Sequence, residues 1–332
     1  MRQKLLFILV ILILFIIIIP VKAQEDNGLE NQYSPFSGMP VDERILQKAI
    51  MAVIENSPQS RPQSGLNDAA IIYEFLVEGG ITRFLSLYWE TVPDKIGPIR
   101  SARPYFVEIA NSYKALLLHA GASPEGFARI EELNIDNLDQ IYNGNYYWRG
   151  SQRETPHNLY TGYFKIQNYL EELTGQEYET RFDFQNISFV SSEDMDAEKI
   201  NIRYTKDYQV KYEYQSQENN YLRYLNDYDN PHMSSREEQL KASNIIIQFV
   251  NTERQDDEGR LKMEILGEGA ALILKDGVAI EGRWVKENNE WTKYYDVDYN
   301  RVELNPGKTW IQVVPVSTQV DIKGSQESDL SE

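Results

Sequence analysis

The sequence predicts an α+β protein, with an α/β-type N-terminal domain of mixed sheet and helices and a smaller β-rich C-terminal domain. Between about residues 49 and 175, apolar strand-like runs alternate with helix-start signals. From about residue 185 the pattern changes to short β-rich runs separated by polar or glycine turns. A hydrophobic content of 42% and a charged content of 25% are typical of a folded globular chain.

The N-terminus has the pattern of a targeting segment. Arg2 and Lys4 precede fifteen apolar residues, Leu5 to Ile19, and Val-Lys-Ala follows at 21–23. These are a charged region, an apolar region of secretory length and a small-residue cleavage site. Residues 1–23 are therefore interpreted as a signal peptide or an uncleaved membrane anchor. Both alternatives place the rest of the chain outside the cytoplasm, either secreted or anchored to the cell membrane.

Polar segments are predicted on both sides of the folded part. Residues 24–40 are polar with scattered Gly and Pro, which indicates a linker, and residues 319–332 are expected to form a disordered tail. Between them, residues 41–185 form the predicted mixed α/β main domain, which carries the candidate anion site. Residues 186–318 form the predicted β-rich C-terminal domain.

The first elements of the main domain are strands. MAVIEN (51–56) is a buried-strand candidate, and the β-rich runs 69–78 and 81–90 are joined by Gly-Gly, which predicts a hairpin. A two-residue loop would pair Glu78 with Ile81. The alternation of side chains along a strand would then put Glu74, Glu78 and Arg83 on one face.

Capping residues predict three helices after the hairpin. Ser101 is a candidate N-cap for a helix that runs to about residue 113. A strand follows at 114–120, and Ser123-Pro124 then predicts a helix over 124–133. Thr161 is a candidate cap for a further helix that ends near Leu173.

Composition excludes several classes of partner and site. A formal net charge of −18 argues against nucleic acid, since phosphate backbones are bound by basic surfaces. The chain has no cysteine, so disulfides, thiolate metal sites, thiol nucleophiles and a cysteine-linked lipid are excluded. Metal-ligand spacings, glycine-rich phosphate loops and a GxSxG elbow are also missing. We expect no metal and no cofactor, and contact with a membrane only through an uncleaved N-terminal helix.

Arginine is concentrated in one part of this acidic chain. Seven arginines but only two lysines lie between residues 61 and 153, and guanidinium groups suit bidentate contacts with carboxylate or phosphate. Arg100 and Arg103 lie where a helix is predicted to begin. A helix N-terminus binds anions but disfavours unpaired cations. A negative group is therefore expected nearby. It is either an external anion or one of the internal carboxylates Glu55, Glu74, Glu78 and Glu90.

Two of the three histidines occupy positions that suit chemistry. His119 ends the strand KALLLHA, and the carboxyl ends of strands are where α/β folds place ligand groups. His157 lies in the loop ETPHNLYT. Together with Glu74 or Glu78, either histidine could act in general acid–base catalysis. The candidate catalytic residues are therefore Glu74, Glu78, His119 and His157, and the sequence leaves open whether the protein is an enzyme.

Five segments in order resemble the bacterial YerB-like lipoprotein family: ENSPQSRPQSGL (55–66), YEFLVEGGITRFL (73–85), KIGPIRSARPYF (95–106), HAGASP (119–124) and PHNLYT (156–161). GEGAALILKDGVAIEGRW (267–284) and GKTWIQVVP (307–315) are similar to the smaller second domain of that family. The resemblance covers about residues 35–315 and implies a two-domain, extracytoplasmic envelope protein of uncharacterised function. Family members typically carry a lipobox cysteine, which this chain lacks.

The leading functional hypothesis is binding of an anionic component of the cell envelope, a peptidoglycan or phosphate-bearing polymer fragment. Arg100 and Arg103 would contact the anion, and Arg83 and Arg61 would support them. The remaining candidates for the binding site are positions in the family-like motifs: Glu55, Asn56 and Asn158. One alternative is a hydrolase of envelope glycan or peptide that uses Glu and His residues. Another is a scaffold that binds envelope proteins, with the arginines purely structural.

Overall fold

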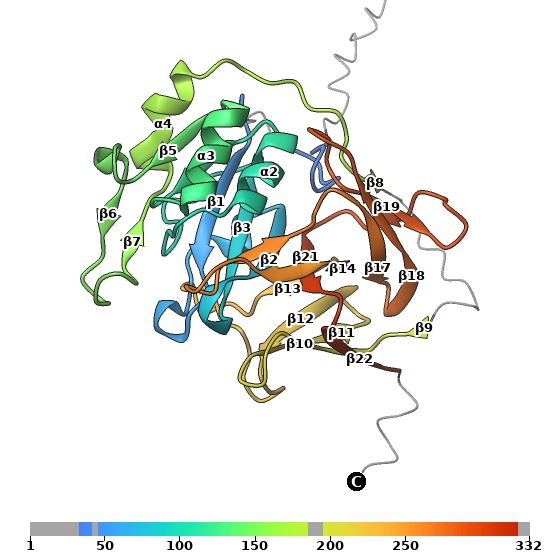
Figure 1. Ribbon diagram of the computed structural model, residues 1–332. Helices are drawn as coiled ribbons and strands as arrows, with labels where there is room; N and C mark the ends of the chain where they lie inside the picture. The colour runs from blue at the N-terminus through green and yellow to red at the C-terminus, as the bar shows by residue number, and fades with distance from the viewer. Residues whose placement is uncertain (1–32, 42–45, 185–194, 325–332) are drawn as a thin grey trace, which may run out of the picture. The chain divides into compact units, whose positions relative to one another are not determined.

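The computed structural model describes residues 33–41, 46–184 and 195–324. These residues form three α-helices and two main β-sheets (Figure 1), so the α+β class expected from the sequence is confirmed. The targeting segment 1–23 and the predicted domain boundary between 185 and 186 lie outside the described residues. No helix of the described part is long and apolar enough to cross a membrane.

The larger sheet has ten strands in one path. In spatial order they are β19 (Lys293–Asp296), β18 (Val278–Lys286), β17 (Gly267–Lys275), β14 (Asn244–Val250), β21 (Thr309–Pro315), β2 (Ile71–Leu76), β3 (Thr82–Tyr88), β1 (Ile50–Glu55), β4 (Leu116–His119) and β5 (Asn137–Asp139). An eleventh short strand, β9 (Met195–Asp196), pairs with β18. Because β21 pairs with both β2 and β14, this sheet includes strands from both sides of residue 185.

The second main sheet has five strands, which lie far from the helices in Figure 1. In spatial order they are β13 (Lys241–Ala242), β12 (Asn220–Leu225), β11 (Gln209–Gln215), β10 (Lys199–Arg203) and β22 (Gln319–Lys323). Three short pairs complete the described strands: β15 (Thr252–Arg254) with β16 (Leu261–Met263), β20 (Glu303–Leu304) with β8 (Asp183–Phe184), and β6 (Trp148–Arg149) with β7 (Leu159–Tyr160).

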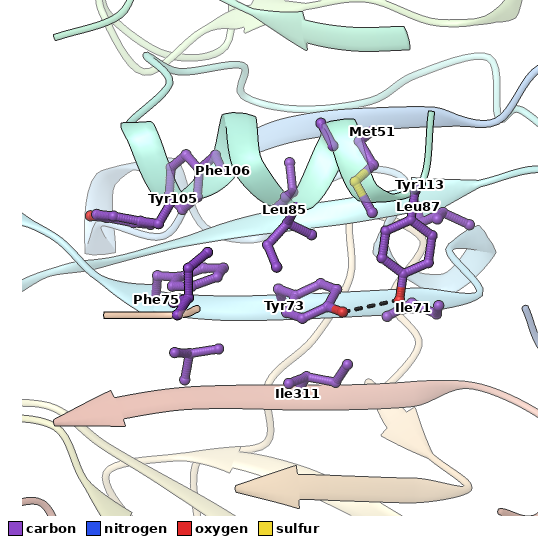
Figure 2. Close-up of a cluster of buried hydrophobic side chains, with 14 of the residues drawn as sticks. Met51, Ile71, Tyr73, Phe75, Leu85, Leu87, Tyr105, Phe106, Tyr113 and Ile311 are labelled. Carbon is purple, nitrogen blue, oxygen red and sulfur yellow. Dashed lines mark hydrogen bonds between the residues drawn. The ribbon is translucent and has the colours of Figure 1, made fainter. Parts of the chain in front are cut away.

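Both faces of the larger sheet are buried. Met51 and Val53 of β1 face one apolar cluster, whereas Ile50, Ala52 and Ile54 face another. The first cluster contains apolar residues of helix α2 (Pro104–Ser112), and Figure 2 shows them packed over the side chains of β2 and β3. The second cluster contains inward residues of the five-stranded sheet. Burial on both faces explains why the central strands are continuous apolar runs.

Helix α3 (Pro124–Leu133) begins as the sequence predicts, because Ser123 Oγ accepts a hydrogen bond of 3.1 Å from the amide of Gly126. The predicted start of α2 is corrected: its N-cap is Arg103, not Ser101. The amide of Ala102 donates to the carbonyl of Gly121 at 2.9 Å. This tertiary pairing holds residues 101–102 in an extended conformation, so the helix starts two residues later.

The cap of helix α4 (Tyr163–Glu172) is also corrected. Gly162 is the N-cap, and the hydroxyl of Thr161 instead donates to the carbonyl of Tyr146 at 2.8 Å. The backbone of Thr161 pairs with Ile96 in an isolated bridge. This bridge keeps Thr161 extended, and its side chain is engaged by a residue distant in the sequence.

The β2–β3 hairpin forms, but its predicted register is wrong by one residue. Val77 N donates to Ile81 O at 2.9 Å, which leaves a three-residue loop, η3 (Glu78–Gly80). Both loop glycines have a positive φ, 75° and 71°, a conformation that L side chains rarely adopt. Glu74 is therefore opposite Phe84, and Arg83 is opposite Phe75. Glu74 and Arg83 thus lie on opposite faces of the hairpin.

Parts of both predicted flexible segments are ordered. Within the segment 24–40 assigned to a linker, Phe36 is fully buried and Tyr33 bridges to Pro40. Within the tail 319–332, residues 319–323 form strand β22, which pairs with β10. Both assignments rested on polar composition, which does not reveal that one buried aromatic ring or one edge strand attaches a segment to the fold.

Candidate functional site

The structure places the predicted site residues in two clusters and two fully buried positions. The Glu55 cluster, at the carboxyl end of β1, brings together Glu55, Asn56, Arg61, Arg100 and His157. Asn158 follows His157 in the chain, and its side chain contacts Arg149 instead. The Glu78 cluster, at the β2–β3 turn, brings together Glu78, Arg83 and Arg103. Glu74 and His119 are both fully buried. Glu74 adjoins the Glu55 cluster, because Asn56 Nδ2 donates to Glu74 Oε1 at 3.3 Å, whereas His119 lies apart from both clusters.

Glu55 is the last residue of β1, and its side chain is almost completely buried. The segment before α2 runs back along β1: Glu55 N donates to Pro98 O at 2.8 Å, and Arg100 N donates to Val53 O at 2.9 Å. This pairing places the guanidinium of Arg100 beside the carboxylate of Glu55, with Nη2 and Oε1 2.8 Å apart. The ion pair is therefore positioned by backbone pairing of two distant segments.

Three donors converge on one oxygen of Glu55. Oε1 accepts from Arg100 Nη2, from Ser57 Oγ at 2.8 Å and from His157 Nδ1 at 2.9 Å. The other oxygen, Oε2, is buried and has no hydrogen-bond partner among the described residues. His157 and Arg100 keep 25% and 22% of their side chains exposed, so the cluster reaches solvent through these two residues.

Three further arginines lie in this cluster or on the segments next to it, but none of them hydrogen-bonds to Glu55 in the described structure. Arg61 donates to the side chain and the carbonyl of Asn56, and Arg153 donates to the carbonyl of Pro62 at 2.7 Å. Arg149 donates to the side chain of Asn158 at 2.9 Å. None of these three contacts involves a carboxylate. Arg61 also lies over the ring of Tyr208 at 5.1 Å and interacts electrostatically with the buried Glu74, so its charge is shared with the Glu74 network.

The prediction did not include Ser57, Arg149 and Arg153. The two arginines lie in the arginine-rich window of the sequence, which was a usable signal for them. Ser57 lies next to Glu55 and Asn56 in the segment ENSPQS, but a serine before a proline is typical of an ordinary turn. Only its contact with Glu55 distinguishes it.

The Glu78 cluster is closed on itself. Arg103 Nε donates to Glu78 Oε2 at 3.1 Å, its Nη2 pairs with Oε1, and its Nη1 donates to the carbonyl of Ala102. Arg83 donates to Glu78 Oε1 at 3.1 Å and to the carbonyl of Ser101 at 3.0 Å. Arg103 is buried and all three nitrogens donate internally. Glu78 thus supplies the negative group that a cation at the start of α2 requires.

The pKa of Glu78 reflects this pairing. Burial alone would raise it, but the hydrogen bond from Arg103 and the charges of Arg83 and Arg103 outweigh burial and lower the pKa. Burial and the neighbouring charge of Arg103 lower the pKa of Arg83 to about 10, and Glu78 opposes this shift. Glu78 is ionised at neutral pH and is poorly suited to act as a general acid.

We predict that Glu78→Gln flattens the acid limb of the stability profile. A carboxyl group whose pKa is lower in the folded than in the unfolded state stabilises the protein at pH values above its unfolded pKa, about 4.3. That stabilisation is lost as the pH falls through its folded pKa. The wild type should therefore lose stability more steeply than the variant between about pH 5 and pH 3. Urea unfolding at several pH values measures this difference. Parallel profiles would show that the Glu78 pairing is energetically neutral.

Glu74 is fully buried in a network that joins the two main sheets. Its carboxylate accepts from Arg223 of β12 at 2.7 Å, from Tyr208 at 2.8 Å and from Thr82 at 2.7 Å. Burial and the charge of Glu74 raise the pKa of Tyr208 to about 12, so this hydroxyl stays protonated and donates. With no access to solvent, Glu74 has the geometry of a structural residue. Arg223 is its principal partner and was not predicted.

His119 ends β4 as expected, but it is fully buried. Its Nδ1 lies 2.8 Å from the carbonyl of Gly121, and its Nε2 lies 3.2 Å from Oδ1 of Asn137. Both are contacts with the turn and strand that follow β4. His119 and His157 therefore do not share a hydrogen-bonding partner in the described structure. Within the described ranges, moreover, no group of three His, Asp or Glu residues is arranged to hold a metal ion.

Both halves of the chain match a known protein family. Residues 36–178 match the N-terminal domain, and residues 200–311 the C-terminal domain, of the protein family of unknown function DUF3048. The chain belongs to the DUF3048 family. The YerB-like resemblance seen in the sequence motifs is thereby confirmed.

One DUF3048 relative is a Bacillus subtilis (strain 168) protein named "Putative lipoprotein YerB". It is 31% identical over 294 residues, which cover 85% of this chain and 86% of the relative. The crystal structure of the YerB protein from Bacillus subtilis superposes with a TM-score of 0.78 and 27% identity, and covers 87% of this chain and 99% of the other. The relative's name describes a lipoprotein, and the family description assigns no activity.

Proposed function

We propose that this DUF3048 protein acts outside the cytoplasm and binds an anionic component of the bacterial cell envelope at the Glu55 cluster. The ligand class is a peptidoglycan or phosphate-bearing polymer fragment. The observation that carries the proposal is the pair of partly exposed donors, Arg100 and His157, on one buried carboxylate at the carboxyl end of β1, a position where α/β sheets commonly bind ligands. The lipoprotein name of the relative supports the envelope location.

Arg100 is the residue best placed to contact the anion. Its side chain is 22% exposed, and among the described residues only its Nη2 donates a hydrogen bond. The partly exposed His157 lies on the same carboxylate and would be a second donor. Arg103, in contrast, is buried and fully engaged by Glu78 and Ala102. We therefore assign structural roles, and no contact with the ligand, to Arg103 and Arg83.

The test replaces Arg100 with lysine, which keeps the charge beside Glu55 but loses the planar fork that suits phosphate or carboxylate. We expect affinity for envelope fragments to fall by about tenfold, the equivalent of one charge-assisted hydrogen bond. Isothermal titration with purified muropeptides and phosphate-polymer fragments measures the change. Arg129→Lys is the matched control, because Arg129 is also ion-paired and 23% exposed. Equal affinities for wild type and Arg100→Lys would contradict this assignment.

A hydrolase is the second candidate, and one observation favours it. Nδ1 of His157 lies 2.9 Å from Oε1 of the buried Glu55. A carboxylate in this position orients an imidazole so that the other ring nitrogen can act as a base. Mass spectrometry of envelope fragments incubated with the protein separates the two candidates. Fragments retained at unchanged mass support binding. Fragments returned at lower mass, with loss of turnover in His157→Gln, support hydrolysis.

A further inference from the structure

A second site is suggested by a cavity that lies away from the Glu55 cluster. It has a volume of about 700 Å³ and is bordered by β12, β13 and the residue just before β21. This volume is within the range that holds small-molecule ligands. The polar side chains that matter here are Asn67, Asn220, Arg236, Gln239, Lys241 and Lys308. Lys308 belongs to the segment GKTWIQVVP (307–315).

The cations of this cavity are not equally neutralised. Arg236 pairs with Asp68 at 3.0 Å and with Glu238 at 3.4 Å, and Lys241 pairs with Glu218 at 3.1 Å. Lys308 has a different partner, because its Nζ donates to the carbonyl of Leu66 at 2.6 Å. Among the described residues, no carboxylate oxygen lies within ion-pair distance of Lys308. Lys308 thus lines the cavity without a direct ion-pair partner in the described structure, and Asp68 and Glu90 act on it only at longer range.

The protonation of Lys308 is sensitive to its surroundings. Burial lowers its pKa to about 7; Asp68 opposes this shift, Arg236 adds to it, and Glu90 opposes it more weakly. The other charged groups that line the cavity are Glu218, Glu238 and Lys241. At neutral pH the amine is therefore partly deprotonated. An anion bound beside it would favour the protonated form.

We propose that this cavity binds a small peptide-like ligand through one carboxylate group, with Lys308 as the anchoring cation. A single negative charge is preferred because Glu218 and Glu238 line the same cavity and would repel a phosphate dianion. The side-chain amide nitrogens of Asn67, Asn220 and Gln239 already donate within the protein. Their amide oxygens can accept from the N–H groups of a peptide, and Asn220 Oδ1 is buried without a hydrogen-bond partner among the described residues. This proposal is independent of the Glu55 cluster.

The first experiment needs no variant. The full chain is titrated calorimetrically at pH 6.5 with N-acetyl-dialanine, which has one carboxylate, and with its C-terminal amide, which has none. We expect the carboxylate form to bind at least about tenfold more tightly than the amide. Equal affinities, or no binding of the carboxylate form, would overturn the proposal. Tighter binding of inorganic phosphate than of the dipeptide would overturn the assignment of a single-charge ligand.

The second experiment tests Lys308 itself. Because ligand binding raises the pKa of Lys308, affinity should be highest below pH 7 and fall by up to about tenfold per pH unit above it. Proton uptake, measured in buffers of different ionisation enthalpy, should accompany binding at pH 7.5. Lys308→Met should remove both the binding and the proton uptake, whereas Lys165→Met, at an exposed position of α4, should change neither. A folded Lys308→Met that binds as the wild type would refute the role of Lys308.

Discussion

Replacing Arg223 with methionine is expected to lower the free energy of unfolding by about 3–5 kcal/mol, because it leaves the fully buried carboxylate of Glu74 without its ion pair. Arg223 is itself fully buried and lies over the ring of Trp310 at 4.3 Å. Its Nε donates to Nδ1 of His232 at 3.0 Å. The substitution therefore removes a charge, a stacking contact and a hydrogen bond at once.

The neighbouring histidine, His232, is buried in the same network. Burial and the charge of Arg223 hold the pKa of His232 well below its ordinary value, so the imidazole is neutral. Its Nδ1 accepts from Arg223, and its Nε2 lies 3.0 Å from Oε1 of Gln63, to which it donates. The loss of Arg223 would leave both Glu74 and His232 with unsatisfied polar atoms.

Urea unfolding of the wild type and of Arg223→Met measures this cost. The matched control is Arg236→Met, because Arg236 is exposed and its ion pair with Asp68 should be worth less than about 1 kcal/mol. The double variant Glu74→Gln with Arg223→Met should be more stable than Arg223→Met alone, since no buried charge remains. A loss below about 1 kcal/mol for Arg223→Met would show that the network does not hold the two sheets together.

Phe36→Ala is expected to destabilise the protein by about 3–5 kcal/mol, the usual cost of truncating a buried Phe to Ala. Phe36 is fully buried and contacts three aromatic rings: Trp89 at 5.8 Å, Tyr113 at 5.9 Å and Tyr178 at 5.1 Å between centroids. It lies in the segment that composition assigned to a linker. A linker residue would tolerate this change, so the variant distinguishes the two descriptions.

The control for this prediction lies three residues away. Tyr33 is also aromatic but is 57% exposed, so Tyr33→Ala should change the free energy of unfolding by less than about 0.5 kcal/mol. Both variants are compared with the wild type by thermal and urea unfolding. Similar stabilities for Phe36→Ala and Tyr33→Ala would mean that the segment 33–40 does not contribute to the folded core.

Much of the local structure follows from local signals. The strand candidate MAVIEN corresponds to β1, KALLLHA contains β4, and helix α3 occupies 124–133 with Ser123 as its cap. These elements were predictable because their signals act within a few residues: apolar runs, a capping hydroxyl and a proline in the first turn. The α+β class depends on the order of such elements, so it was predictable as well.

Elements whose boundaries depend on distant partners were predicted less well. The caps of α2 and α4 shifted because Ala102 and Thr161 pair with backbone segments elsewhere. The hairpin register differed by one residue because two consecutive glycines permit either a two-residue or a three-residue loop. That single residue decides which face each side chain occupies, and it separates Glu74 from Arg83.

The sequence alone determined the fold class, the family and the concentration of arginines around candidate carboxylates, since composition, local motifs and residue spacing carry that information. Only the tertiary structure decided which arginine pairs with which carboxylate. Arg100 joins Glu55 at a partly exposed edge, Arg103 joins Glu78 in a closed cluster, and Glu74 joins Arg223 in the interior. The physical reason is that an ion pair depends on the distance and burial of its two groups. Both are set by strand register and by packing between segments up to 149 residues apart.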